Sequence, residues 1–267
     1  MKVLLLRHGE TEGNREKRYV GSRSDESITA EERMRLYLAG KHPERSALNT
    51  LGNIKTIYVS PMQRCLETEQ LLFSAPEFKQ ASVIPVVGLR ECDFGAFEYK
   101  NYKELDGCPE YQRFIDSGGT EGFPEGESVN AFKKRCRDTF LRLMKLHISE
   151  EMKDQEESSP ETVVFVVHGG TIMSIMEAFA KPEADYYSWH VKNAAGFLCA
   201  KRPDLEAERN SAGVRGDVPR PAAGEGGVAA WRRHTAGNHC GGDVRTGQCL
   251  RHCQSAPPRA ADRRQAF

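Results

Sequence analysis

The sequence lacks a long hydrophobic run near its start: the first apolar stretch, residues 3–6, is closed by Arg7 and His8. Such a run is too short for a membrane-spanning helix or for the apolar region of a secretory signal. The chain also lacks an excess of one charge sign, because 38 basic side chains balance 38 acidic ones. A balanced charge argues against a surface that coats nucleic acid. These absences predict a cytoplasmic protein that binds neither membranes nor nucleic acid.

Recognisable cofactor motifs and paired cysteines are missing too. The sequence has no GxGxxG dinucleotide signature, no GxxxxGK[ST] phosphate loop and no internal repeat. Its eight cysteines are scattered, so they are interpreted as reduced thiols rather than as a disulfide framework. Histidines and cysteines gather between residues 234 and 253, but their spacing matches no standard zinc finger. We therefore expect no cofactor and no bound metal ion.

The composition changes near residue 200. Acidic residues outnumber basic ones before it, whereas eleven arginines and one lysine face seven acidic residues after it. Residues 201–267 contain no Ile, Tyr or Met and are rich in Arg, Gly, Ala and Pro. So little apolar surface cannot offset the entropy lost when a backbone becomes ordered. The sequence predicts a folded domain at residues 1–200 and a disordered or non-native tail at residues 201–267.

Short apolar runs alternate with amphipathic segments through the predicted domain. Thr29 is expected to cap a helix, Pro61 to lie in the first turn of another, and Pro85 to place its strand at an edge. Between residues 88 and 126 only short helices are expected. The alternation predicts an α/β three-layer sandwich, a mostly parallel sheet with helices on both faces. Strands are predicted at residues 2–6, 55–60, 82–87, 162–167 and 196–200, and helices at 29–39, 61–73, 127–148 and 170–180.

Polar side chains follow directly after four of the predicted strands. Ligands of open α/β sheets bind beyond the carboxyl ends of the strands, so these side chains should converge. Arginine forks bind phosphate oxygens, a neutral imidazole can attack phosphorus, and a carboxylic acid can protonate the leaving oxygen. The pattern therefore predicts phosphoryl transfer. The residues are Arg7, His8 and Glu10 after the first strand, Ser60 and Arg64 after the second, Arg90 and Glu91 after the third, and His168 after the fourth.

Four motifs, in the same order along the chain, resemble those of the histidine phosphatase superfamily, which has the phosphoglycerate-mutase-like fold. The resemblance covers about residues 1–200. The sequence departs from the family pattern at residues 22–24 and after Ala200. The motifs are RHGET at 7–11 with Asn14, SPMQRCLET at 60–68, LRECDFG at 89–95 with Glu98, and VHGG at 167–170, and the PEGES segment at 124–128 also recurs in the family.

The resemblance implies a role for each matching residue. His8 is implied as the nucleophile that becomes a phosphohistidine, Glu91 as the proton donor, and His168 as a second catalytic imidazole in the phosphate pocket. No metal ion is implied, because arginines supply the positive charge. Substrate contacts are implied for Arg7, Asn14, Gly21, Arg64 and Gly169. The acid could instead be one of three other carboxyl groups, those of Glu10, Asp93 and Glu98.

Two of these roles carry physical requirements. A nucleophilic His8 must be neutral at the attacking nitrogen, so its other nitrogen should donate to a backbone carbonyl or a carboxylate. A proton-donating Glu91 must stay protonated near neutral pH, which requires that burial or a nearby negative charge raises its pKa. The sequence thus predicts where hydrogen bonds and burial should be found.

The amino-acid sequence of the third motif is similar to that of the alpha-ribazole phosphatase type of small phosphatase. The mutase branch of the family carries a longer insertion after this motif, whereas Gly95 and Pro124 are close in this chain. We therefore expect a metal-independent phosphomonoesterase that acts on a small phosphorylated metabolite, as a monomer or homodimer. The alternatives are a phosphoglycerate mutase that uses the same histidine, and an inactive phosphate-binding homologue with a damaged C-terminus.

Overall fold

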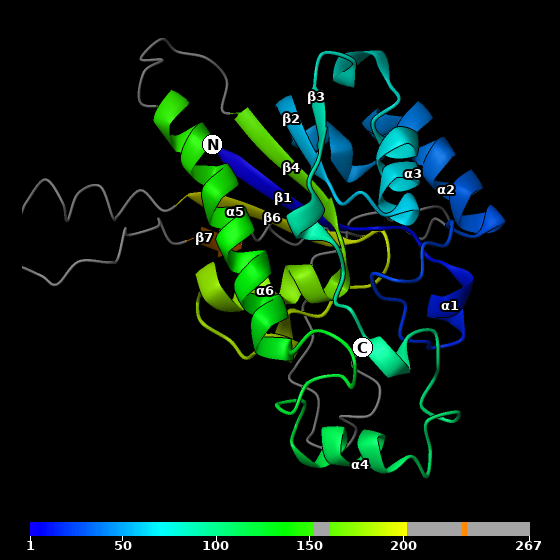
Figure 1. Cartoon of the computed structure of the whole chain (residues 1–267). Helices are drawn as coiled ribbons and strands as arrows, with labels where there is room; N and C mark the ends of the chain where they lie inside the picture. Colours follow the sequence, from blue (N-terminus) through cyan, green and yellow to red (C-terminus); the bar gives the residue numbers. More distant parts are fainter. Residues whose placement is uncertain (152–160, 202–230, 234–267) are drawn as a thin grey trace, which may run out of the picture.

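A computed structural model of the chain describes residues 1–151, 161–201 and 231–233. Within these residues the strands form one 7-stranded sheet in the order β3-β2-β4-β1-β6-β7-β5. Figure 1 shows the sheet at the centre of the molecule. The strands are β1 (Lys2–Arg7), β2 (Asn53–Val59), β3 (Ser82–Pro85), β4 (Glu161–Val167), β5 (Ala180–Lys181), β6 (Gly196–Lys201) and β7 (Trp231–Arg233).

The pairing makes the sheet mixed but mostly parallel. Strand β4 is parallel to both β1 and β2, and β3 is parallel to β2 at the edge, where Pro85 predicts it. Strand β6 runs antiparallel to β1, with Leu6 opposite Gly196. The antiparallel direction brings the chain that enters β6 next to the chain that leaves β1.

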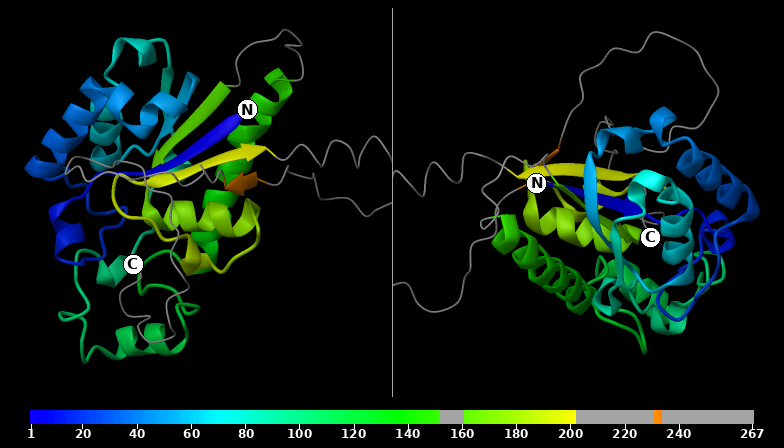
Figure 2. Two further views of the ribbon diagram at one scale, coloured as in Figure 1. Left: turned by 180° about the vertical axis from the view of Figure 1, so that it is seen from behind. Right: turned by 90° about the horizontal axis from the view of Figure 1, so that it is seen from above.

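Helices cover both faces of this sheet (Figures 1 and 2). The helices α2 and α3 lie on one face, and α5 and α6 lie on the other. The predicted three-layer α/β sandwich is therefore confirmed. The helices are α1 (Glu12–Arg15), α2 (Ala30–Lys41), α3 (Gln63–Leu72), α4 (Pro109–Asp116), α5 (Val129–Glu151) and α6 (Gly169–Phe179).

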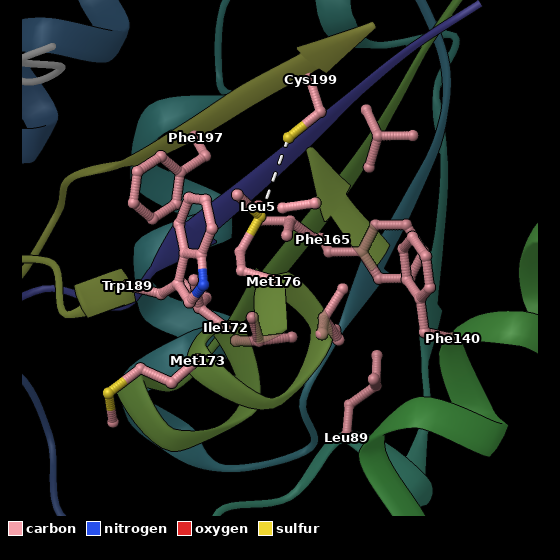
Figure 3. Close-up of a cluster of buried hydrophobic side chains, with 14 of the residues drawn as sticks. Leu5, Leu89, Phe140, Phe165, Ile172, Met173, Met176, Trp189, Phe197 and Cys199 are labelled. Atoms are coloured by element: carbon pink, nitrogen blue, oxygen red, sulfur yellow. Dashed lines mark hydrogen bonds between the residues drawn. The ribbon is translucent and has the colours of Figure 1, made fainter. Parts of the chain in front are cut away.

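The central strands are buried on both faces, and their side chains alternate between two cores. In β1, Val3 and Leu5 join the core beneath α5 and α6, while Leu4 and Leu6 join the core beneath α2 and α3. This period of two follows from the pleat of a strand. In Figure 3 the first core is seen around Phe165, with Phe140 of α5 packed against it. Burial on both faces fixes the register of β1, and with it the position of the residues that follow it.

Local signals place two of the four predicted helix starts, those of α2 and α6, to within one residue. Thr29 caps α2, and its hydroxyl accepts a hydrogen bond from the Glu32 amide at 3.1 Å. The expectation for Pro61 is wrong, because α3 begins at Gln63 and Met62 is its N-cap. The reason is a distant side chain: Asp25 accepts a hydrogen bond from the Gln63 amide at 2.6 Å, which supplies the partner that a cap would otherwise provide.

The segment between residues 88 and 126 holds only short helices, as predicted. Its 3-10 turn Gly95–Phe97 and the helix α4 pack through their own aromatic cluster against the start of α5, whereas Leu89 of the 3-10 turn Val87–Leu89 joins the core beneath α5 and α6. Helix α4 and this cluster lie beyond the sheet, at the end where β1 and β4 finish (Figure 1). They therefore stand next to the residues that follow the strands.

Four described residues of the predicted tail belong to the sheet, namely Lys201 at the end of β6 and the three residues of β7. Strand β7 pairs with β6 and with β5. The remainder of residues 202–267, including the histidines and cysteines between 234 and 253, lies outside the described residues, and so the domain boundary stays a prediction. None of the helices within the described ranges has the length and apolar character needed to cross a membrane.

Candidate active site

The carboxyl ends of β1, β2 and β4 meet at one edge of the sheet, and a cavity lies beside them. Its polar end carries two side chains predicted for catalysis and three groups predicted to contact substrate. The described residues contain no group of three or more His, Cys, Asp or Glu side chains placed to hold a metal ion. The residues of this polar end are Arg7, His8, Asn14, Glu91, Gly169 and Gly170, and further polar residues line the cavity elsewhere.

His8 follows β1 directly and is held by the backbone of the neighbouring strand. Its amide donates to the Val167 carbonyl at 2.9 Å, and its side chain is 3% exposed. The Nδ1 atom lies 2.7 Å from the Gly9 carbonyl oxygen. A carbonyl can only accept, so Nδ1 carries the proton and Nε2 keeps its lone pair. This is the contact that a nucleophilic His8 requires.

The charge state of His8 follows from its surroundings. Desolvation by burial, and then the positive charges of Arg64 and Arg7, hold the pKa of this imidazole well below its ordinary 6.5. The ring is therefore neutral at neutral pH. A neutral ring with a free Nε2 lone pair is a competent nucleophile towards phosphorus.

His168 brings the second imidazole to the first. It is the N-cap of α6, it is fully buried, and its ring centroid lies 5.2 Å from that of His8. Arg64 donates from Nε to His168 Nδ1 at 3.3 Å. An arginine keeps its proton, so His168 accepts at Nδ1 and donates from Nε2 to the Ser60 hydroxyl at 2.7 Å. Desolvation, followed by Arg64, lowers the pKa of His168 well below 6.5, so this ring is neutral as well.

Arg64 is fully buried in a cage of backbone carbonyls. It donates to the Ser24 and Gly21 carbonyl oxygens at 2.8 and 3.0 Å. The backbone must pass very close here, since a Cβ added to Gly21 would stand 2.4 Å from the Cys92 carbonyl oxygen. The Gly21 carbonyl thus supports Arg64 from behind, and the substrate contact expected of Gly21 stays a prediction. Neither Gly21, Arg64 nor His168 belongs to the lining of the cavity.

Arg7 is the arginine that reaches the polar end of the cavity. One of its Nη1 hydrogens is donated to the Val191 carbonyl at 2.8 Å. Its Nε is buried and has no hydrogen-bond partner among the described residues. Burial lowers the pKa of Arg7, but a guanidinium remains charged at neutral pH. A buried cation with unused N–H groups is suited to bind phosphate oxygens.

Glu91 lines the cavity with its carboxyl group anchored by two amides. Oε1 accepts from the Cys92 amide at 2.9 Å, and Oε2 accepts from the Gly170 amide at 3.3 Å. Burial raises the pKa of this carboxyl above its ordinary 4.5. Burial outweighs the two amide donors and the charges of Arg64 and Arg7, which favour the carboxylate, so the net shift is toward the protonated form that a proton donor needs.

The three alternative acids are engaged elsewhere. Glu10 is half-exposed and pairs with Arg15 at 2.8 Å. Asp93 pairs with Arg23 at 2.8 Å. Glu98 accepts backbone hydrogen bonds at 2.9–3.2 Å, which shape the loop that cages Arg64. Its donors are the amides of Gly21, Arg23, Ser24 and Phe94. Of the four candidate carboxyls, Glu91 is the one that lines the cavity.

Asn193 is a functional candidate that the sequence did not reveal. Its Nδ2 donates to Asn14 Oδ1 at 2.8 Å and lies 3.3 Å from the carbonyl oxygens of His8 and Gly9. Asn14 lines the cavity and its Oδ1 is occupied, so Nδ2 is the side-chain atom with which Asn14 can donate to a ligand. The position of Asn193 just before β6 could have identified it, because the residues that precede a strand antiparallel to β1 lie beside the residues that follow β1.

Arg135 of α5 is a second candidate that the sequence did not single out. It forms a double ion pair with Glu127, with N–O distances of 2.7 and 2.9 Å. It also donates to the carbonyls of Gly88, Arg90 and Glu91 at 3.0, 2.9 and 3.3 Å. Arg135 therefore holds the backbone that carries the Glu91 carboxyl, which makes it a positioning residue.

Replacing Arg135 with methionine keeps the packing of its stem but removes its hydrogen bonds. We expect kcat to fall about tenfold to a hundredfold, as for small misplacements of catalytic groups. If a protonated Glu91 is required, activity falls as pH rises through the raised pKa of this carboxyl. In R135M this fall should occur at lower pH, because a loosened loop lets water reach Glu91 and brings its pKa back toward the ordinary value. The exposed Arg137→Met, on the same helix, is the matched control. Unchanged kcat and pH profile in R135M would contradict the positioning role.

A comparison with known proteins finds one matching family and several similar proteins. The family model of the histidine phosphatase superfamily (branch 1) matches residues 3–199. A Klebsiella pneumoniae protein described as "Probable phosphoglycerate mutase GpmB" is 30% identical over 148 residues, which is 55% of this chain and 64% of that protein. "Phosphoglycerate mutase-like protein 4" of Arabidopsis thaliana is 28% identical over 189 residues, covering 68% of this chain and 72% of that protein. The chain thus spans about 64% of the length of the first of these relatives.

Solved structures share the fold. The alpha-ribazole phosphatase from Shigella flexneri superimposes with a TM-score of 0.60 at 20% identity, covering 76% of this chain and 92% of that one. The structure of Rv3214 from Mycobacterium tuberculosis gives a TM-score of 0.54 at 25% identity, covering 76% and 92%. At 20% identity, the likeness to the Shigella flexneri structure shows a shared fold.

Proposed function

Because the chain belongs to the histidine phosphatase superfamily, branch 1, we propose that it is a metal-independent phosphomonoesterase that works through a phosphohistidine on His8. Its substrate is a small phosphorylated metabolite in the cytoplasm. One observation carries the proposal: a neutral His8, with its Nε2 lone pair free, lies at a cavity that also holds the Arg7 guanidinium and the Glu91 carboxyl. These three groups are a nucleophile, an anion site and an acid.

In the first step the Nε2 lone pair of His8 attacks phosphorus, and the ester P–O bond breaks. The proton of the Glu91 carboxyl passes to the departing oxygen, so the alcohol leaves neutral. The Arg7 guanidinium and the Gly169 amide at the start of α6 stabilise the negative charge on the phosphoryl oxygens. The products of this step are a free alcohol, a phosphohistidine and the Glu91 carboxylate.

In the second step the Glu91 carboxylate removes a proton from water. The water oxygen attacks phosphorus, the P–N bond breaks, and its electron pair returns to His8 Nε2. Inorganic phosphate leaves and Glu91 is again protonated. His168 remains neutral throughout, and its N–H toward Ser60 keeps the ring next to His8 in one orientation.

The second candidate function is a phosphoglycerate mutase, which the descriptions of the curated relatives favour. A mutase would use the same phosphohistidine but return the phosphoryl group to a different hydroxyl of the substrate. That reaction requires the intermediate to be shielded from water. In this chain the described residues between 88 and 126 form only short helices and turns.

A panel of phosphomonoesters tests the proposal. The full chain is assayed for phosphate release in the presence of EDTA, and interconversion of 2- and 3-phosphoglycerate is followed in parallel. We expect phosphate release from at least one ester and no interconversion. Interconversion without phosphate release would establish the mutase instead. A folded chain that does neither would be the inactive phosphate-binding homologue.

A further inference from the structure

Beyond its polar end, the cavity has a wall of aromatic rings. The rings come from five places in the chain: the loop after α1, the loop after Glu91, the loop before α5, α5 itself and the 3-10 turn Tyr186–Trp189. Aliphatic and thioether side chains, those of Val20, Val129 and Met173, lie among them. The rings of this wall are those of Tyr19, Phe94, Phe123, Phe132 and Tyr186.

The wall is preformed, because its rings hold one another in place. The Phe94 centroid lies 5.1 Å from that of Tyr19 and 4.9 Å from that of Phe123, both edge-to-face. Phe114 supports Phe123 from behind at 4.7 Å. These four side chains are at most 7% exposed. A ligand group placed against such a wall gains apolar contact with little cost of ordering side chains.

The cations near this wall are already occupied. Arg18 lines the cavity, but its guanidinium pairs with Glu16 and Glu104 and donates to the Tyr99 carbonyl. Lys133 lies 4.1 Å from the centroid of the Tyr186 ring and pairs with Glu177 at 2.9 Å. A carboxylate on the substrate would lose water here without gaining a free cation, and that costs affinity.

One more lining residue could carry positive charge. Desolvation and the nearby Arg7 lower the pKa of His190 below 6.5, so its ring is neutral at neutral pH. Among the lining residues, Arg7 is then the cation without a carboxylate partner that the ligand can use, and Arg7 belongs to the phosphate end. The cavity thus offers one anion site and one apolar site.

We infer that the substrate is a phosphomonoester whose alcohol part is an uncharged aromatic or apolar group that lies against this ring wall. The inference rests on the proposed function and narrows it. Phosphate at the Arg7 end would place the ester oxygen near Glu91, and the alcohol carbon skeleton would continue toward Phe94, Phe123 and Phe132. An ester of a short hydroxy acid such as phosphoglycerate would leave the rings uncovered and its carboxylate without a partner.

Three synthetic esters test the inference, because they share the same kind of leaving oxygen and differ only at the far end. They are propyl phosphate, 3-phenylpropyl phosphate and 3-carboxypropyl phosphate. With the full chain, we expect kcat/KM for the phenyl ester to exceed that for the propyl ester by about 10- to 100-fold, the gain typical of burying one ring. The carboxy ester should be no better than the propyl ester.

A pair of variants shows whether the wall is responsible. Phe123→Leu removes a ring from the cavity lining, whereas Phe114→Leu removes the ring directly behind it. F123L should lower kcat/KM for the phenyl ester roughly 3- to 10-fold more than for the propyl ester, which corresponds to the loss of one aromatic contact. F114L should affect both esters by the same factor. Thermal unfolding of both variants reports whether each remains folded.

The outcomes separate the inference from the proposed function. Equal kcat/KM for the propyl and phenyl esters, or a preference for the carboxy ester, overturns the inference while the phosphatase activity stands. The inference is also overturned, and the phosphatase activity still stands, if none of the three synthetic esters is hydrolysed but other esters of the panel are. A folded chain that releases phosphate from no ester at all contradicts the proposed function itself.

Discussion

Replacing His8 with asparagine is expected to lower kcat/KM by at least about 10⁴-fold, the scale seen when an enzyme loses its nucleophile. Asparagine keeps a polar side chain at this buried position, so the fold should persist. His8→Ala should have the same effect on activity. The exposed His42, which lies near Glu44, provides the control, since His42→Ala should leave turnover unchanged.

The same prediction has a chemical readout. The wild-type chain, mixed with substrate and denatured within one turnover, should carry phosphate that is stable in base and released in acid, as expected for a phosphoramidate. The H8N variant should carry none. Full activity in H8N, or acid-labile phosphate that persists in it, would remove the covalent step from the mechanism.

Replacing Glu91 with glutamine is expected to lower kcat about 10²- to 10⁴-fold for esters of poor leaving groups, the usual contribution of a general acid. An ester such as 4-nitrophenyl phosphate needs little protonation of its leaving oxygen, so its cleavage to the phosphohistidine should fall much less. The half-exposed Glu10 pairs with Arg15, and Glu10→Gln is the matched control. A similar loss in the rate of phosphohistidine formation for good and poor leaving groups would assign Glu91 a role other than proton donor, because the later hydrolysis step is common to all esters.

The pH profile gives a second test of Glu91. Activity requires Glu91 to be protonated, and burial raises its pKa above 4.5, so activity falls as pH rises through that raised value. Activity also requires His8 to be neutral, and its pKa lies well below 6.5, so the acidic limb falls only below that value. E91Q should lose the alkaline limb and keep the acidic one. An alkaline limb that survives in E91Q would belong to another group.

The side chains at the strand ends were predictable because they depend on local order in the sequence. Apolar runs such as the one ending at Leu6 form buried strands, and a residue that follows a parallel strand is delivered to the carboxyl edge of the sheet. The sequence could therefore place His8, Glu91 and His168 at the same edge of the sheet before any of their hydrogen-bond partners was known. The proton on His8 Nδ1 could also be predicted, since its acceptor is the adjacent Gly9 carbonyl.

Other features depended on contacts between segments that are far apart along the chain. Asn193 contacts Asn14 because β6 runs antiparallel to β1. Arg135, which lies on α5, donates a hydrogen bond to the backbone of Glu91. The Gly21 carbonyl accepts a hydrogen bond from Arg64. Hydrogen-bond partners and burial are set by which segments pack together, and neither periodicity nor motif spacing encodes that. The residue types at the end of each strand could thus be predicted from the sequence alone. Which carboxyl lines the cavity, which arginine is free for phosphate, and which rings face the ligand were settled only by packing in three dimensions.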